Sequence, residues 1–238
     1  MPVILVTGGK GQLGSELALV SGHYKSFSFL FIDKNEVDIT DELAFTQYAK
    51  QHKISYIINC AAFTAVDLAE TEQHVCRQVN EEAPEILAKF CKQSGARLIH
   101  ISTDYVFDGN GNKPIKEDDS TNPLSVYGKT KLAGEKKVLS ILDNAYVIRT
   151  AWVYSVFGKN FVKTMLGLGE QRDQLNVVVD QVGCPTNARD LAKAILTIIE
   201  NIEKATITLV FTTIPTKGYC LGSTLQRLYF KSQASPVR

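Results

Sequence analysis

The sequence predicts an α/β fold: a doubly wound, Rossmann-like parallel sheet, followed by a smaller C-terminal domain. Short apolar runs such as residues 2–7 alternate with helical patterns, and such runs are typical of strands buried on both faces. A glycine-rich stretch, Gly8–Gly14, lies between the first expected strand and the first expected helix, the context of a dinucleotide-binding loop. We therefore expect a dinucleotide-binding domain over residues 1–155 and a partial substrate domain over residues 156–238.

Composition excludes several classes of protein. The 238 residues are 45% hydrophobic and carry a net charge of +1, which gives no reason to expect nucleic acid as a partner. The five cysteines are scattered without a Cys-x-x-Cys pair, which argues against a disulfide framework or a zinc site. No signal peptide opens the sequence, and no apolar run approaches the ~18 residues of a membrane span. We expect a cytoplasmic protein without a membrane partner.

The first domain reads as strands alternating with helices. Further strands are expected at residues 27–32, 54–60, 97–102 and 145–148. Helices are expected from Glu16 onward and at 41–52, 72–94 and 125–141, with a break around Pro84 in the third. Such alternation predicts crossover connections and a parallel sheet, and ligands bind outside the carboxyl ends of parallel strands. The residues that follow each strand are therefore the candidates for function.

The pattern changes in the last third of the chain. We expect a helix at 160–168 and a strand at 174–179. An amphipathic helix is expected at 190–202, within a helical region near 187–203, and this helix should pack back on the sheet. All 25 acidic residues lie at or before Glu203, whereas residues 205–238 are acid-free and show no usable periodicity. A reading-frame change or a replaced terminus would produce such a break, so an incomplete substrate domain is predicted.

The glycine loop reads as Gly9-x-Gly11-x-x-Gly14 or as Gly8-x-x-Gly11-x-x-Gly14. Glycines let the backbone approach a pyrophosphate, which then binds free N–H groups at the helix N-terminus. A tight turn without a ligand is the alternative.

Asp33 ends the second strand, where a carboxylate can bind a ribose 2′-hydroxyl and favour NAD. Lys10 and Lys34 are close enough to admit a 2′-phosphate instead. A simple turn aspartate is equally consistent with the sequence at Asp33, and Asp38 with Ile39 could instead flank the adenine.

Three residues later in the chain suggest proton transfer to a substrate. Tyr127 and Lys131 are four residues apart on an expected helix, so both project from one face, where the ammonium would lower the pKa of the phenol. Thr103 follows the fourth strand, and its hydroxyl could hydrogen-bond a carbonyl oxygen of a substrate. Singly, each has an ordinary explanation, as a surface helix pair or a strand-end cap, but together with the glycine loop they indicate an oxidoreductase.

At this point the sequence resembles the extended, nucleotide-sugar branch of the short-chain dehydrogenase/reductase superfamily, and within it most closely the dTDP-4-dehydrorhamnose reductases. The resemblance covers residues 1 to about 203 and rests on six motifs, found at Thr7–Gly14, Asn59–Glu70, Ser102–Gly109, Val126–Glu135, Arg149–Tyr154 and Asp180–Thr186. It implies reduction of the 4-keto group of a dTDP-4-dehydro-6-deoxy sugar to dTDP-L-rhamnose with NADPH or NADH. A homodimer and the participation of a divalent cation are left open.

The resemblance also implies roles for single residues. Tyr127 would protonate the nascent alkoxide, Lys131 would bind the nicotinamide ribose, and Thr103 would hydrogen-bond the reacting oxygen. Substrate would face Asp104, Tyr105 and Trp152, although a core position for Trp152 is nearly as consistent. The cofactor would be lined by Gly8, Gly11, Gln12, Leu13, Gly14, Asp33, Asp38, Ile39, Ala62, Phe63 and Thr64.

Two departures from related patterns matter. Similar 4,6-dehydratases carry Thr-Asp-Glu where this chain has Thr103-Asp104-Tyr105, so the base for dehydration is missing and reduction is favoured. The irregular 205–238 segment keeps two alternatives open: a non-catalytic, cofactor-binding regulatory subunit of the same fold, or another nucleotide-sugar reductase or epimerase.

Overall fold

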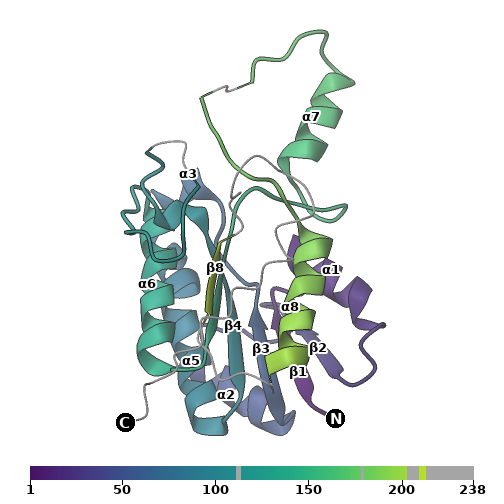
Figure 1. The fold of residues 1–238 in the computed structure, drawn as a ribbon, viewed down its shortest axis with the longest axis vertical. Helices are drawn as coiled ribbons and strands as arrows, with labels where there is room; N and C mark the ends of the chain where they lie inside the picture. Colours follow the sequence, from purple (N-terminus) through teal and green to yellow (C-terminus); the bar gives the residue numbers. More distant parts are fainter. Residues whose placement is uncertain (111–113, 178–179, 203–208, 213–238) are drawn as a thin grey trace, which may run out of the picture.

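In the computed structural model, which describes residues 1–110, 114–177, 180–202 and 209–212, a six-stranded parallel sheet forms the centre. The order β2-β1-β3-β4-β5-β8 reverses direction between β1 and β3, which makes the sheet doubly wound and confirms the predicted fold class (Figure 1). The strands are β1 (Val3–Thr7), β2 (Ser28–Ile32), β3 (Ile54–Asn59), β4 (Arg97–Thr103), β5 (Tyr146–Thr150) and β8 (Leu209–Thr212).

Helices cover both faces of this sheet (Figure 1). One face carries α2 (Glu42–Gln51), α5 (Ala83–Ser94) and α6 (Val126–Ile141), and the other carries α1 (Gln12–Ser21) and α8 (Ala188–Ile202). The remaining short elements are α3 (Val66–Ala69), α4 (Gln73–Arg77), a π-helical turn (Gln78–Glu82), a 3₁₀ turn (Asp104–Val106), α7 (Phe161–Gly169), and the small parallel pair β6 (Val153–Tyr154) and β7 (Thr186–Asn187).

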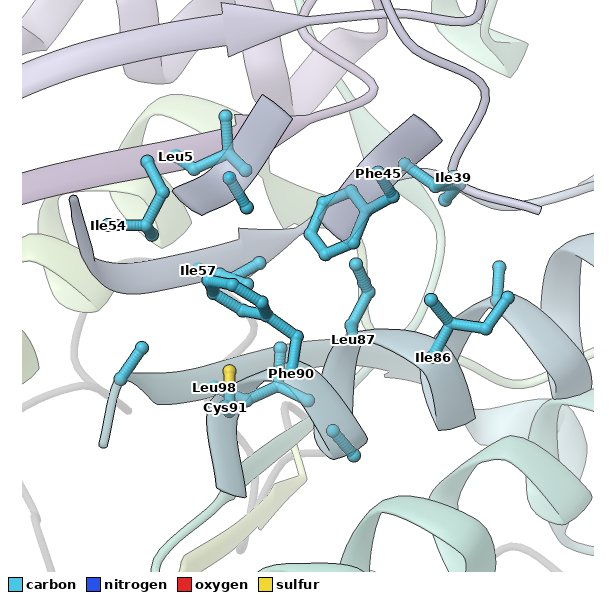
Figure 2. Packing of buried hydrophobic residues seen from close by; sticks show 14 of the residues in the cluster. Leu5, Ile39, Phe45, Ile54, Ile57, Ile86, Leu87, Phe90, Cys91 and Leu98 are labelled. Carbon is cyan, nitrogen blue, oxygen red and sulfur yellow. The ribbon is translucent and has the colours of Figure 1, made fainter. Parts of the chain in front are cut away.

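The core beneath α2 and α5 holds the first face of the sheet together (Figure 2). Leu5, Ile57 and Leu98 project from neighbouring strands and are fully buried, as the two-residue period of a strand requires. Phe45 and Phe90 meet edge to face above them with ring centroids 5.6 Å apart. Burying each such side chain contributes about 1.5–3 kcal/mol, so this layer fixes the strands whose ends carry the candidate site.

On the opposite face, α8 buries a stripe of apolar residues spaced by four. Leu191, Ile195 and Ile199 pack against Ile4 and Val6 of β1 and against α1. The sequence of α8 therefore belongs with the sheet, although residues 170–177 and 180–185 before it form no helix or strand.

Three elements differ from the sequence-based expectations. The helical stretch 72–94 has its irregularity at residues 78–82, as a π-helical turn, rather than at Pro84. Pro84 has no N–H to donate to the carbonyl of residue 80, and the turn before it widens. Residues 174–177 form no strand, and the rest of the expected strand, 178–179, lies outside the described residues. Conversely, β8 was not predicted, because residues 205–238 show no periodicity; most of that segment is outside the described residues.

Candidate functional site

The glycine loop turns sharply between β1 and α1. Gly8 has φ of +66°, and a Cβ there would lie 2.8 Å from the backbone nitrogen of Ala61. A Cβ on Gly14 would lie 2.3 Å from the carbonyl oxygen of Gly8, and the N–H of Gly11 donates to that same oxygen at 3.0 Å. Glycine is therefore required where the loop packs against the start of α1 and the end of β3, because a side chain would collide with backbone atoms there.

The N-terminus of α1 is left open toward the same side. Its N-cap is Gly11, which offers no side-chain cap, and the first turn holds no acidic residue. The N–H groups of the first turn are thus available to an anion, supported by the positive end of the helix dipole. Leu13 is buried in the core, whereas the side chain of Gln12 turns away from the loop toward Asn160.

Asp33 and Asp38 both engage the protein itself. Asp33 accepts a hydrogen bond of 2.6 Å from the backbone N–H of Lys10 and so ties the glycine loop to the end of β2. Asp38 accepts from the N–H and hydroxyl of Thr40, and these hydrogen bonds hold its pKa below the usual range. Ile39 is buried in the core beneath α2 and α5. The turn interpretation of Asp33 thus has direct structural support, and its carboxylate still lies beside the loop.

The loop after β3 is fixed by a residue that the sequence did not single out. Asn80, fully buried in the π-helical turn, accepts from the N–H of Phe63 at 2.8 Å and donates to its carbonyl at 3.0 Å. Its amide also lies 3.4 Å from the Thr130 hydroxyl on α6. Asn80 thereby joins the segment Ala62–Thr64 to the helix that carries Tyr127. A single buried amide leaves no periodic signal in a sequence, which is why it was missed.

Thr103, Tyr127 and Lys131 meet at the carboxyl end of β4. Thr103 ends that strand, and its side chain is hydrogen-bonded to the Tyr127 phenol. Lys131, one helical turn after Tyr127, is 2% exposed and donates to the carbonyl of Ile101 at 2.7 Å. The structure therefore brings together three residues that are up to 28 positions apart in the sequence.

The electrostatics of this group differ from the sequence-based expectation. Burial raises the pKa of Tyr127 to about 12, and the hydrogen bond with Thr103 offsets only part of that shift. Burial also lowers the pKa of Lys131 to about 8. Burial is the largest influence on both groups, and it shifts the pKa of the Tyr127 phenol in the direction opposite to the lowering expected from Lys131.

The N-terminus of α6 is held by two side chains. Ser125 accepts from the N–H of Gly128 at 3.1 Å, and Glu70 accepts from the N–H of Val126 at 2.8 Å. Gly128 packs so closely on the Tyr105 carbonyl that a Cβ would lie 2.2 Å from that oxygen. These contacts set the position of Tyr127 in the first turn of the helix.

Of the residues expected to face a substrate, Asp104 and Tyr105 border this group. Tyr105 is 44% exposed, and its ring meets that of Tyr127 edge to face at 5.5 Å. Asp104 accepts from the Thr103 hydroxyl, and burial raises the pKa of its carboxyl group. Trp152 is 47% exposed with φ of +48° and lies against Gly183, so a core position for this aromatic is wrong.

A buried ion pair ties α6 to β5. Arg149 donates to both carboxylate oxygens of Glu135, at 2.7–3.2 Å, and also to the carbonyl of Glu117. Its guanidinium lies 5.1 Å from the centre of the Phe107 ring. The pair fixes the helix that carries Tyr127 and Lys131 against the sheet. Glu135 and Arg149 both lie in motifs that carry the family resemblance, but the sequence assigned them no role.

Within the described part of the chain, neither a candidate metal site nor a helix able to span a membrane is found. Among those residues, no cluster of three or more His, Cys, Asp or Glu side chains could bind a metal ion. None of the helices found there is long and apolar enough to cross a bilayer.

The glycine loop and the N-terminus of α1, together called the cradle, lie at the point where the strand order reverses. This cradle and the sheet order define a protein of the Rossmann-like α/β class. More specifically, the chain belongs to the family described as the RmlD substrate binding domain, whose model matches residues 1–213. A dTDP-4-dehydrorhamnose reductase of Streptomyces griseus is 44% identical over 192 residues, which is 80% of this chain and 63% of that protein. The chain thus spans just under two-thirds of that relative.

Solved structures agree with this assignment. The crystal structure of a dTDP-4-dehydrorhamnose reductase from Clostridium acetobutylicum is 42% identical, with a TM-score of 0.84, covering 90% of this chain and 74% of that one. The enzyme from Bacillus anthracis, solved in complex with NADP, is 33% identical with a TM-score of 0.85, covering 91% and 76%.

Proposed function

We propose that the chain acts as an NAD(P)H-dependent reductase of the 4-keto group of a dTDP-4-dehydro-6-deoxy sugar, giving dTDP-L-rhamnose. The observation that carries the proposal is the group Thr103, Tyr127 and Lys131, buried at the carboxyl end of β4 in a sheet that also presents an uncapped glycine loop. The names of the relatives, reductases of this sugar, supply the substrate class.

The cradle fits a dinucleotide. Gly8, Gly11 and Gly14 let the loop pack tightly where α1 begins, and the uncapped N–H groups of that helix suit a pyrophosphate. Bound NADPH or NADH would supply the hydride from its reduced nicotinamide. Ala62–Thr64 and Lys131 would contact it on the nicotinamide side, and Asp33 with Lys10 and Lys34 would face the adenosine ribose. The NADP bound by the Bacillus anthracis relative favours NADPH, with NADH as the alternative.

The side chains divide the remaining work. With its pKa near 12, Tyr127 carries its proton at neutral pH and can donate it to the oxygen that becomes an alkoxide. The Thr103 hydroxyl would hydrogen-bond that oxygen and hold it in place. Lys131 would bind ribose hydroxyls, and Asp104, Tyr105 and Trp152 would line the sugar side.

The division into a dinucleotide-binding domain, 1–155, and a substrate domain, 156–238, is part of this proposal, as are a cytoplasmic location and a homodimer. The amphipathic helix α8 packs with the first domain. Sedimentation of the purified chain tests the dimer, with a single species of 26.3 kDa as the result against it.

NADPH oxidation with enzymatically made dTDP-4-keto sugar tests the function. We expect sugar-dependent loss of absorbance and dTDP-L-rhamnose as product. Cofactor binding without any turnover would favour the rival, a regulatory subunit of the same fold. Release of a different dTDP-hexose would point to another reductase or epimerase.

A further inference from the structure

The side chain of Gln12 contacts a segment that is distant in the sequence. Its Oε1 accepts a hydrogen bond of 2.9 Å from Asn160, and its Nε2 donates to the carbonyl of Val153 at 3.4 Å. Gly158, with φ of +63°, packs so closely that a Cβ there would lie 2.9 Å from Cγ of Gln12. Residues 153–160, which we call the strap, therefore attach to the first turn of α1.

A second attachment lies one turn further along the same helix. Glu16 is 2% exposed, and its carboxylate accepts from the Ser155 hydroxyl at 2.7 Å and from Nε of Arg189 at 2.8 Å. Residues four apart project from one face of a helix, so Gln12 and Glu16 hold the strap from the same side. Because burial of a carboxylate is costly unless it is paired, this contact is a built attachment rather than a chance approach.

The strap ends in the residue that begins α7. Oδ1 of Asn160 accepts from the N–H of Lys163 and caps that helix, while its Nδ2 donates to Gln12 and to the carbonyl of Ser155. The helix α7 stands beyond the carboxyl ends of the strands, apart from the sheet (Figure 1). No residue of α7 is buried, and besides Asn160 the Lys163 ammonium ties the helix to the strap by donating to the carbonyls of Val156 and Gly158 at 3.0 Å.

We propose that Gln12 and Glu16 hold the strap so that a dinucleotide at the glycine loop and the placement of α7 on the ligand side of the sheet are coupled. The inference rests on the proposed function for its ligand. The backbone N–H groups of the first turn of α1 would bind the pyrophosphate, while the side chain of Gln12, in that same turn, holds Asn160. Ser155 and Asn160 are positioning residues in this arrangement, and the coupling is reciprocal by linkage.

Hydrogen–deuterium exchange of the full chain tests the attachment without any ligand. Gln12→Met keeps the length of the side chain and the backbone N–H but removes both hydrogen bonds. We expect exchange at residues 161–169 to quicken on the order of fivefold, with 83–94 in α5 unchanged. Gln12→Glu keeps an acceptor for Asn160 and should restore much of the protection. Ser155→Ala, which removes the bond to Glu16 and the bond that the Ser155 hydroxyl accepts from the N–H of Phe157, is the second variant if Gln12→Met folds poorly.

The same measurement with NADPH tests the coupling. In the wild type, NADPH should slow exchange at both the glycine loop and 161–169, whereas in Ser155→Ala it should slow the loop equally and 161–169 to a smaller extent. Equal slowing of 161–169 in both proteins would overturn the coupling. Unchanged exchange of Gln12→Met and Ser155→Ala in the free protein would overturn the attachment. Failure of the wild type to bind NADPH would instead overturn the proposed function and the coupling with it, leaving the attachment to be judged from the free protein.

Discussion

Replacement of Glu135 by Gln tests whether the buried ion pair holds α6, the helix that carries Tyr127 and Lys131. The variant leaves the Arg149 guanidinium, 6% exposed, without its counter-charge beneath α6. Removal of one partner from a buried pair costs about 3–5 kcal/mol. For a chain of this size, each kcal/mol lowers Tm by about 2–4 °C, so a fall on the order of 6–20 °C is expected.

A matched control lies two residues further along the same helix. Lys137 pairs with Glu85 and Glu81 in a partly exposed position, with its side chain 35% exposed, and salt bridges that water reaches contribute about 0–1 kcal/mol. Lys137→Met should therefore lower Tm by at most a few degrees. Differential scanning calorimetry compares the two variants directly. Equal, small changes for Glu135→Gln and Lys137→Met would refute the argument that the buried pair fixes α6.

Two further predictions follow from the site. Gly14→Ala places a Cβ 2.3 Å from the Gly8 carbonyl, so it should destabilise the loop and weaken NADPH binding by more than tenfold, measured by fluorescence titration; unchanged affinity would contradict the cradle. The pKa of Lys131, about 8 when folded against 10.5 for the exposed group, means that the unfolded chain binds more protons between those values. Stability of the ligand-free protein should therefore rise with pH in that window by more in the wild type than in Lys131→Met, and identical pH profiles of Tm would contradict the burial argument.

Much of the fold could be predicted because its signals are local. The run that became β1 is apolar up to its last residue, and those that became β3 and β4 are mostly apolar. The stripe Leu191, Ile195 and Ile199 marks α8 without reference to any other element. The π-helical turn and β8 could not be found in this way. The first depends on the missing N–H of Pro84, and the second depends on a neighbouring strand rather than on its own pattern.

The candidate site divides in the same manner. Thr103, Tyr127 and Lys131 were predicted because their spacing and their place after a strand are visible in the sequence. The effect of burial on the pKa values of Tyr127 and Lys131 could not be predicted, since burial is a property of the whole fold. Along the sequence, Asn80 is distant from Phe63, and Asn160 is distant from Gln12. No spacing rule connects such positions.

The central claim is that Tyr127 is the proton donor in reduction of a nucleotide-sugar ketone. The most direct measurement compares the wild type with Tyr127→Phe in NADPH oxidation with dTDP-4-keto sugar, with NADPH affinity measured alongside. We predict sugar-dependent turnover in the wild type and a loss of about 10²–10⁴ in rate for the variant, with NADPH still bound. Equal rates in the two proteins, or no turnover in either while NADPH binds, would contradict the claim.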